Sequence, residues 1–383
     1  MSKRLFMVAG EASADMHAAT LLIELKKLNP DLHCLGVGGP MLRGLGMETI
    51  LDSERLNVVG ISDWLDRASE VLGGYRKVIN SLKSNPPDYA VLIDLPDFNL
   101  RVAKHLKRLG VPVVYYISPQ VWAWRKYRIK QIKRDVDLML VVFPFEKEFY
   151  AREGLNVEFV GHPLLESIRG RESFRSQSEI FNSPRIALLP GSRKSEVRFH
   201  GPILKELAAE IIQKYPGAEF RVPVATTLSD VFVKQYMDSK CLNFQSGNSH
   251  EVLGWADIAV VASGTATLET ALVGTPFTLF YKVSKTSAWL YRNLMSYRGF
   301  IGMPNLLLQT EVVKEYFQDL ANPKTLYSEV DHLIQDENYR TTQASLLVKC
   351  RNLLGDRGAN QRAAQSIDTF WRKLRQNKQE RPA

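Results

Sequence analysis

Short apolar runs rich in valine, isoleucine and leucine alternate along the chain with longer segments of helical spacing. The runs lie at residues 5–9, 90–93, 111–117, 138–143, 186–189, 220–224, 258–262 and 277–281. Runs of this length between helical segments are typical of buried parallel strands in an α/β protein. The polar segment 169–184 divides them into two groups of four. The pattern therefore predicts two nucleotide-binding-type domains with a cleft between them, where ligands bind at the carboxyl ends of the strands.

The two groups of strands set the expected domain boundaries. We expect a first domain over residues 1–168, a linker over 169–184 and a second domain over 185–355. Residues 356–383 are expected to form a C-terminal amphipathic helix, whose apolar stripe consists of Ala363, Ile367, Phe370, Trp371 and Leu374. Because such a stripe needs a partner, we expect this helix to pack back on the first domain.

The composition fits a globular protein. Hydrophobic residues make up 45% and charged residues 24% of the 383, which argues against a disordered or transmembrane chain. The first apolar run, residues 5–9, is too short for a signal peptide, so we expect a cytoplasmic protein. The three cysteines are widely separated, which predicts neither a disulfide framework nor a zinc site.

The excess of positive charge is local. The net charge is +9, and the segment from Phe98 to Arg134 has ten lysines and arginines and no acidic residue. A basic cluster attracts the phosphates of nucleic acid, of anionic lipid or of a substrate. Two helices with solvated faces would explain the same run, and composition does not choose among these interpretations.

Two loops in the first half have candidate chemistry. GEASAD, residues 10–15, joins the first strand to a helix and suits an anion or sugar site, although Ser13 and Asp15 would also suit helix capping. It is neither a GxGxxG nor a P-loop, which disfavours a dinucleotide cofactor. IDLPDFN places Asp94 at the end of a buried strand, where partial desolvation would make it a general base. Helix capping is the alternative, and it fits Asp97 better than Asp94.

The second half has a predicted nucleotide-sugar pocket. LPGSR ends in Arg193, a cation suited to a diphosphate. In ASGTATLE, we expect Ser263, Gly264 and Thr265 to offer backbone N–H and hydroxyl donors at a helix N-terminus. Glu269, one helical turn on, would accept both ribose hydroxyls. Asn305 in MPNLLLQ is a polar residue among apolar ones and a candidate ligand of the cleft.

Together with SPQVWAWR, FPFEK and GHP, these motifs resemble those of lipid-A-disaccharide synthases, in the same order and over nearly the whole chain. The resemblance implies an inverting GT-B glycosyltransferase with two Rossmann-like domains facing across a cleft. It implies transfer of 2,3-diacylglucosamine from its UDP derivative to 2,3-diacylglucosamine 1-phosphate (lipid X), giving the β-1,6 disaccharide 1-phosphate and UDP. The chain departs from the family pattern at Ala14 and in the last residues of MPNLLLQ.

Carried onto this chain, the resemblance makes Asp94 the base that takes the proton of the acceptor's 6-hydroxyl. It assigns other residues to binding, with an acceptor group (Glu11, Ser13, Asp97 and Asn305) and a UDP group (Arg193, Ser263, Gly264, Thr265 and Glu269). No cofactor is expected. Asp135 and Asp137 are like the metal-binding DxD motif of another glycosyltransferase class. In that class an apolar strand precedes the motif, whereas here the apolar strand follows it, so we expect no catalytic metal.

Both implied substrates carry acyl chains, which indicates work at a membrane surface. The segment 64–82 has an apolar stripe of helical spacing, from which we expect Trp64, Leu65, Val71, Leu72 and Val78 to enter the lipid. A stripe of this kind is more often core. From the acyl chains of the implied substrates, we nevertheless expect a peripheral protein on the cytoplasmic face of the inner membrane. Its expected partner is anionic lipid rather than nucleic acid. A homodimer is compatible with this. The alternatives are another GT-B UDP-sugar enzyme, an epimerase, or a nucleic-acid-binding protein.

Overall fold

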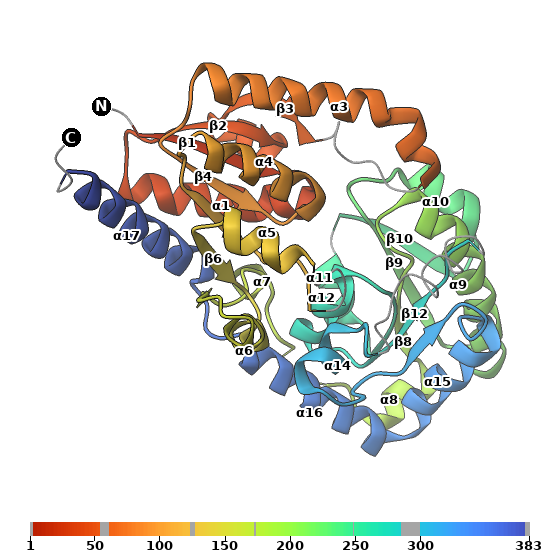
Figure 1. Cartoon of the computed structure of the whole chain (residues 1–383). Helices are drawn as coiled ribbons and strands as arrows, with labels where there is room; N and C mark the ends of the chain where they lie inside the picture. Colours follow the sequence, from red (N-terminus) through yellow and green to blue (C-terminus); the bar gives the residue numbers. More distant parts are fainter. Residues whose placement is uncertain are drawn as a thin grey trace. The chain divides into compact units, whose positions relative to one another are not determined.

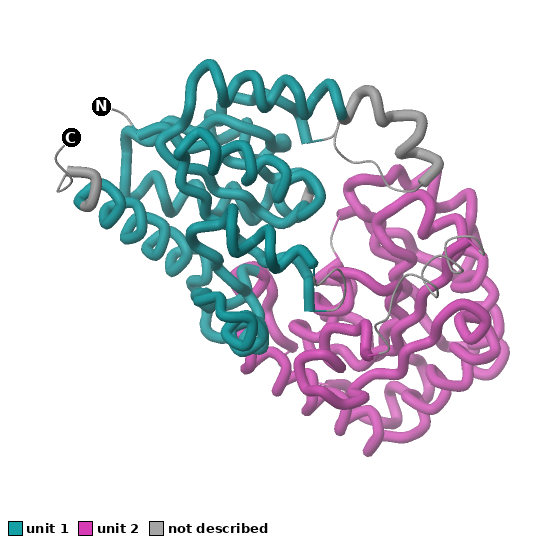
Figure 2. The backbone as a smooth tube through the Cα atoms, viewed as in Figure 1, with its two compact units in different colours: residues 1–163, 355–383 teal, residues 164–354 magenta. Residues whose placement is uncertain are grey.

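The computed structural model describes residues 3–53, 61–122, 127–171, 174–247, 249–284 and 299–379. The chain divides into two compact units, coloured separately in Figure 2. Unit 1 comprises Met1–Pro163 and Gly355–Ala383, and unit 2 comprises Leu164–Leu354. Each unit contains a parallel sheet covered by helices, which confirms the predicted pair of Rossmann-like folds.

Among the described residues of unit 1, seven parallel strands form one sheet (Figure 1). Their order is β3 (Glu48–Asp52), β2 (His33–Gly38), β1 (Arg4–Ala9), β4 (Tyr89–Ile93), β5 (Val113–Tyr116), β6 (Leu138–Val141) and β7 (Glu158–Phe159). The helices are α1 (Ala12–Leu28), α2 (Pro40–Gly44), α3 (Ile61–Ser84), α4 (Pro96–Arg108), α5 (Arg128–Asp135), α6 (Pro144–Arg152) and α17 (Ala359–Gln379). Apart from their first residues, the strands β1 and β4 at the centre are fully buried and apolar, because both faces of the sheet are covered.

The C-terminal helix α17 belongs to unit 1, as the sequence predicted, and packs along α1. The ring of Trp371 stacks on that of Tyr89 with centroids 5.0 Å apart. At the polar edge of the contact, the Asn29 amide donates a hydrogen bond of 2.9 Å to Asp368. The apolar stripe of this helix therefore covers the sheet-bearing core of unit 1.

Among the described residues of unit 2, six parallel strands form the second sheet. Their order is β10 (Leu242–Ser246), β9 (Glu219–Val224), β8 (Arg185–Leu189), β11 (Ile258–Ala262), β12 (Phe277–Tyr281) and β13 (Glu315–Phe317). The helices are α7 (Leu164–Ser167), α8 (Gln177–Asn182), α9 (Lys194–Lys214), α10 (Asp230–Met237), α11 (Ser249–Trp255), α12 (Thr265–Val273), α14 (Met303–Leu308), α15 (Pro323–Gln335) and α16 (Glu337–Leu353).

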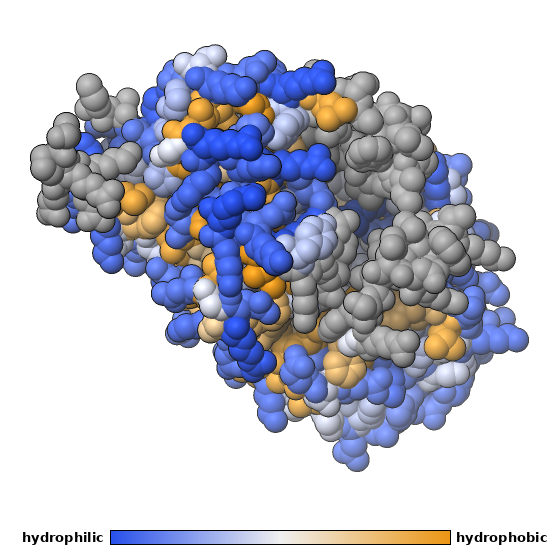
Figure 3. Space-filling model, in the orientation of Figure 1, coloured by the Kyte–Doolittle hydropathy of each residue, from blue (hydrophilic) through white to orange (hydrophobic). Residues whose placement is uncertain are grey.

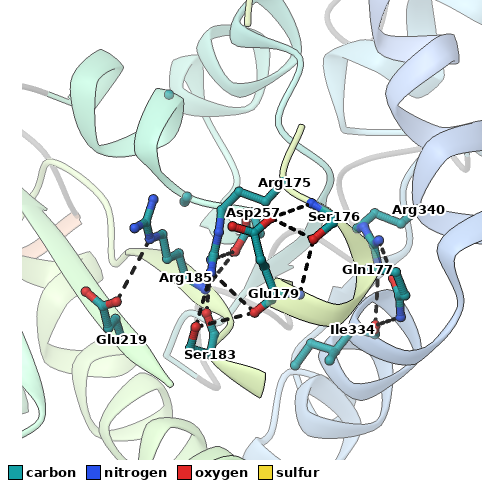
Figure 4. A network of polar contacts seen from close by, with 12 residues as sticks. Arg175, Ser176, Gln177, Glu179, Ser183, Arg185, Glu219, Asp257, Ile334 and Arg340 are labelled. Carbon is teal, nitrogen blue, oxygen red and sulfur yellow. Dashed lines mark hydrogen bonds and ion pairs between the residues drawn. The ribbon is translucent and has the colours of Figure 1, made fainter. Parts of the chain in front are cut away.

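The polar segment 169–184, expected to be a linker, lies inside unit 2. Figure 4 shows the network that holds it there. The Arg175 guanidinium donates a 2.7 Å hydrogen bond to the buried carboxylate of Asp257, which directly precedes β11. The Gln177 amide donates to the backbone oxygen of Ile334 at 2.9 Å. The segment is polar because its side chains bond to the unit, and not because it is a free connection.

In helix α3, one of the residues expected to enter the lipid is buried instead. Val78 is fully buried in the core of unit 1, together with Ile79 and Leu82. Its side chain packs against the sheet, so Val78 is a core residue and not a lipid contact. Leu72 is exposed at 49%. The side chains of Trp64, Leu65 and Val71 lie outside the part of the chain that the structure describes. In that part, no helix has the length and apolar character needed to cross a bilayer.

Candidate functional site

The loops that follow β1, β4 and β5 lie at one edge of the unit 1 sheet, because these strands are neighbours and parallel. The turn after β4 has an unusual backbone. Asp94 and Leu95 both adopt left-handed conformations, with φ of +48° and +42°. Consecutive non-glycine residues in this region cost free energy and are maintained only where the surroundings impose them. Such positions cluster at functional sites.

Two buried side chains bind the backbone oxygen of Asp94. The Asn99 amide donates to it at 2.7 Å, and the Tyr115 hydroxyl donates to it as well. Both side chains are fully buried. The Asn99 amide also donates to the oxygen of Ile93 at 3.1 Å. These contacts fix the direction in which the Asp94 carboxyl group leaves the strand.

The carboxyl group of Asp94 is suited to accept a proton near neutral pH. Burial of the group, and then the negative charge of Glu11, raise its pKa from 3.8 to about 6, against the opposing effect of the Leu95 backbone N–H. A carboxylate with this pKa is ionised at pH 7 and is a stronger base than an exposed aspartate. Glu11, at the start of α1, is thus close enough to Asp94 to act on it electrostatically.

The other predicted acceptor residues of unit 1 lie on helix N-termini. Asp97 is exposed in the first turn of α4 and forms an ion pair with the buried Arg128 of α5. Ser13 is partly buried in the first turn of α1. Asp15 has a structural role, because its carboxylate accepts the backbone N–H groups of Gly39 at 2.8 Å and Met41 at 2.9 Å. It therefore caps α2 rather than its own helix.

In unit 2, Arg193 follows β8 and is the residue that caps α9. Its guanidinium donates to Glu196 at 3.3 Å, and its side chain is 43% exposed. The same glutamate accepts the backbone N–H of Ser192 at 3.0 Å. Gly191 has a φ of +107°, and a β-carbon there would lie 2.3 Å from the Glu196 carboxylate. Contacts with Glu196 thus fix the conformation of this loop, and the Arg193 guanidinium remains partly exposed beside it.

The loop after β11 leads to the N-terminus of α12, where the sequence predicted a binding turn. Gly264 and Thr265 are exposed at the N-terminus of α12, where partial positive charge favours an anion. Gly264 has a φ of +149°, which favours glycine. One expectation is corrected. The backbone N–H of Ser263 donates to Phe280 on β12 at 3.0 Å, so the sheet uses this donor and only the hydroxyl could reach a ligand.

Glu269 lies on α12, and α11 supplies its partners. Its carboxylate accepts the Ser249 hydroxyl at 3.1 Å and lies 3.7 Å from the imidazole nitrogen Nε2 of His250. The side chain retains 20% exposure. A carboxylate oriented in this way, with part of its surface open, could accept hydroxyl donors from a ligand.

The predicted role of Asn305 in ligand binding is corrected. The side chain is fully buried in α14. Its amide donates to Val313 and Glu315, both at 2.8 Å, and its oxygen accepts the backbone N–H groups of Val312 at 2.7 Å and Val313 at 2.9 Å. Every donor and acceptor of the amide is used by the protein. Asn305 therefore fixes the segment before β13 and has no group left for a substrate.

Sequence reasoning missed His200 in α9. This side chain is fully buried and joins two loops at the carboxyl edge of the unit 2 sheet. Its Nδ1 atom bonds to the Pro190 oxygen at 2.7 Å, and Nε2 accepts the backbone N–H of Lys282 at 3.1 Å. Burial lowers the pKa of His200, which keeps it neutral in this role. A single histidine within a helix gives no sequence signal for such a connection.

No group of three histidine, cysteine or acidic side chains is placed to hold a metal ion in the described part of the chain. The pair considered for a metal has other partners. Asp135 is buried and bonds to the neighbouring Arg134 at 2.6 Å. Asp137 accepts the backbone N–H of Val113 at 3.0 Å. These carboxylates stabilise the start of β5 and the end of α5.

Comparison with known families decides the assignment. The profile of the family described as lipid-A-disaccharide synthetase matches residues 5–369. The chain belongs to this family. The lipid-A-disaccharide synthase of Anaeromyxobacter sp. (strain K) is 39% identical over 373 residues, which cover 96% of this chain and 97% of the relative. That of Nitrosococcus oceani is 39% identical over 356 residues, covering 91% and 92%. The protein is therefore a glycosyltransferase of lipid A biosynthesis, as the motifs indicated.

Solved structures that resemble the chain have the GT-B fold. The UDP-GlcNAc 2-epimerase from Neisseria meningitidis, solved with UDP-GlcNAc, aligns with a TM-score of 0.62 at 13% identity over 96% of this chain and 100% of that chain. The calicheamicin glycosyltransferase CalG4 aligns with a TM-score of 0.59 at 15% identity, over 96% and 98%. At these identities the likeness establishes the fold alone, which confirms the predicted fold class.

Proposed function

We propose that the chain transfers 2,3-diacylglucosamine from UDP-2,3-diacylglucosamine to lipid X, with Asp94 as the general base. The observation that carries the proposal is Asp94 itself, a carboxyl group fixed at the end of β4 with its pKa raised to about 6 in a member of this family. The alternative is another UDP-sugar reaction, such as epimerisation, because the epimerases share the fold. An epimerase needs no acceptor.

In the proposed reaction, Asp94 takes the proton of the acceptor's 6-hydroxyl as this oxygen attacks the anomeric carbon of the donor. The new C–O bond forms as the bond to the UDP oxygen breaks, and the electron pair of that bond leaves with UDP. Attack from the face opposite to UDP inverts the anomeric centre and gives the β-linkage. The developing charge on UDP would be stabilised by Arg193 and by the N-terminus of α12. Glu269 would accept the ribose hydroxyls.

The decisive experiment measures UDP release from the donor with lipid X present and absent. Release that requires lipid X supports the transferase, whereas conversion of the donor sugar without any acceptor supports the alternative. Asp94→Asn should lower turnover by roughly 100-fold or more while UDP affinity stays near that of the wild type. If Asp97→Asn is inactive and Asp94→Asn is active instead, the base lies three residues further along.

Binding of UDP is tested separately by calorimetry. Arg193→Ala and Glu269→Ala should each weaken UDP binding by roughly 1.5 to 3 kcal/mol, because each would lose a charge-assisted hydrogen bond. Lys205→Ala provides the control, since Lys205 is an exposed cation on α9, the helix that Arg193 caps. Unchanged affinity in both test variants would remove these residues from the nucleotide site.

We also propose that unit 1 binds the anionic surface of the inner membrane through its basic face. Figure 3 shows hydrophilic side chains gathered over α3, α4 and α5. The exposed cations there are Arg76, Lys77 and Lys83 on α3, Arg101, Lys104, Lys107 and Arg108 on α4, and Lys130, Lys133 and Arg134 on α5. Each cation near an anionic surface contributes about 1 kcal/mol. The exposed Leu72 on α3 would add apolar contact.

Sedimentation with vesicles of phosphatidylglycerol and phosphatidylcholine tests this second proposal. Replacing Lys104, Arg108 and Lys130 with Gln should reduce binding and its dependence on salt, with an unchanged melting temperature. Lys205, Lys240 and Lys349, three exposed cations of unit 2, provide the matched control when replaced in the same way. Equal loss in both variants would mean that only net charge matters, and would contradict a basic membrane face on unit 1.

A further inference from the structure

The turn at Asp94 and Leu95 has an energetic cost that local sequence does not explain. Left-handed backbone costs a non-glycine residue roughly 1–2 kcal/mol, and two consecutive residues have it here. Aspartate adopts this region more readily than most residues, but leucine rarely does, so the larger part of the cost falls on Leu95. Since the turn forms nevertheless, tertiary contacts must outweigh the cost.

Three contacts hold the turn from different sides. The Tyr115 hydroxyl and the Asn99 amide both donate to the Asp94 backbone oxygen. The side chain of Leu95 packs closely against Gly10 at the end of β1, where a β-carbon would lie 2.2 Å from Leu95 Cδ2. The two polar donors act on the same atom, the carbonyl oxygen of the residue that bears the proposed base. They therefore control the backbone conformation that directs its carboxyl group.

The Asn99 side chain is not explained by packing alone. Asn99 is fully buried, and its Oδ1 atom has no hydrogen-bond partner among the described residues, so the amide leaves one acceptor unsatisfied while using its two donors. Such an orphan acceptor costs about 1–3 kcal/mol. A smaller apolar residue would avoid that cost but could not bind the Asp94 oxygen.

We propose that Tyr115 and Asn99 are positioning residues, which hold Asp94 in its left-handed conformation so that the carboxyl group meets the acceptor hydroxyl. The inference rests on the proposed role of Asp94 as the base. Catalytic groups need placement within about half an ångström, and an error of about 1 Å can cost on the order of 100-fold in rate. Loss of one donor should therefore act on turnover more than on binding or folding.

The chain provides a matched pair for the test. Tyr115 and Tyr116 are neighbours on β5, both fully buried, and both have a hydrogen-bonded hydroxyl. The Tyr115 hydroxyl donates to Asp94, whereas that of Tyr116 donates to Asn360 on α17 at 3.1 Å. Replacing either with Phe removes one buried hydroxyl from the same strand. The two variants should differ in activity only through what each hydroxyl contacts.

We expect Tyr115→Phe to lower kcat by roughly 10- to 100-fold, with UDP affinity unchanged and a melting temperature close to that of Tyr116→Phe. Tyr116→Phe should stay within about twofold of wild-type turnover. The acidic limb of the pH–rate profile should also move to lower pH in Tyr115→Phe, because a released carboxyl group relaxes toward water. Asn99→Ala should show the same pattern, with a larger loss of stability.

A double variant separates positioning from a general structural effect. In the Asp94→Asn background, Tyr115→Phe should cause little further loss, because the hydroxyl acts through the carboxyl group already removed. Full additivity would overturn the inference, as would equal turnover in Tyr115→Phe and Tyr116→Phe. These outcomes differ from failure of the proposed base, which would appear as wild-type turnover in Asp94→Asn alone.

Discussion

Gly10 and Leu95 are in such close contact that a β-carbon on Gly10 would lie 2.2 Å from Leu95 Cδ2. The two residues are separated by 85 positions and follow neighbouring parallel strands, β1 and β4. The glycine is therefore required by proximity. Through this contact, the loop that begins with Gly10 and Glu11 is coupled to the turn that presents Asp94.

Gly10→Ala should displace Leu95 and disturb the turn. Because the clashing atom is the end of a side chain, we expect a moderate loss of stability of about 1–3 kcal/mol and a larger relative loss of turnover. Thermal unfolding and kcat would be measured together. Gly44→Ala is the control, since a β-carbon on Gly44 would meet no atom within 4 Å beyond its own helix and chain neighbours.

Asp94→Asn should make the folded protein more stable at pH 8 while abolishing turnover. The pKa of Asp94 is raised from 3.8 to about 6, so the folded protein binds this proton more tightly than the unfolded chain does. The ionised group therefore opposes folding, and wild-type stability falls as pH rises through this window, by up to roughly 3 kcal/mol. Asparagine carries no such cost. Denaturant titrations at pH 8 and below pH 3.8 should show the gain only at pH 8, and Asp31→Asn, at an exposed position, should show none.

Glu11→Gln should move the acidic limb of kcat/KM to lower pH. The negative charge of Glu11 is the second cause of the raised pKa of Asp94, so its removal favours the ionised base. Because the pKa of Asp94 is about 6, the acidic limb of the wild-type kcat/KM profile should lie near pH 6. The variant Glu24→Gln, on the same helix but paired with Lys27, should leave the limb in place. A limb that moves equally in both variants would contradict a local effect.

Asn305→Ala should destabilise unit 2 without a specific loss of substrate affinity. The change leaves the buried N–H groups of Val312 and Val313 without an acceptor, at about 1–3 kcal/mol each. Thermal unfolding would report the loss, and calorimetry with UDP below the melting temperature should give near wild-type affinity. Asn338→Ala, at an exposed position, serves as the control.

His200→Phe should weaken UDP binding indirectly. The phenyl ring can keep the edge contacts of the imidazole with Phe280 and Tyr281, at centroid distances of 4.9 and 5.4 Å. It cannot bond to Pro190 or Lys282, so the loops after β8 and β12 lose their connection. We expect UDP affinity to fall by several-fold and hydrogen exchange to increase at both loops. Exchange that is unchanged would contradict the connection.

Most central strands of the two sheets were predictable from the sequence, and the edge strands were not. All eight apolar runs became strands, because each is covered on both faces. The strands β3, β7, β10 and β13 were missed because they are edge strands, with shorter or partly exposed segments. The strand β2 was missed because glycines interrupt its apolar pattern. One of them, Gly36, lies so close to Met7 that a β-carbon would be 1.9 Å from its backbone oxygen.

At the candidate site, the sequence singled out residues in the loops that follow central strands. Asp94 and Arg193 were chosen in this way, since strand ends are readable from the apolar pattern, and their roles stay predictions. Asn305 was misassigned because a buried polar residue that serves the backbone looks the same in sequence as one that serves a ligand. Tyr115 and His200 were missed because nothing in the sequence links the Tyr115 hydroxyl to Asp94 or His200 to Lys282, and only the folded chain brings these groups together.

The placement of α17 in unit 1 affects the order in which the protein can fold during its synthesis. Unit 2 is continuous in sequence, from Leu164 to Leu354, and is complete before α17 has been translated. Unit 1 begins first but ends last, because Tyr89 and Asn29 await Trp371 and Asp368. Until then the α1 surface that receives α17 remains uncovered. During synthesis the first unit therefore exposes this apolar surface until the whole of unit 2 has been made, and exposed surface of this kind makes an incompletely folded chain prone to aggregation.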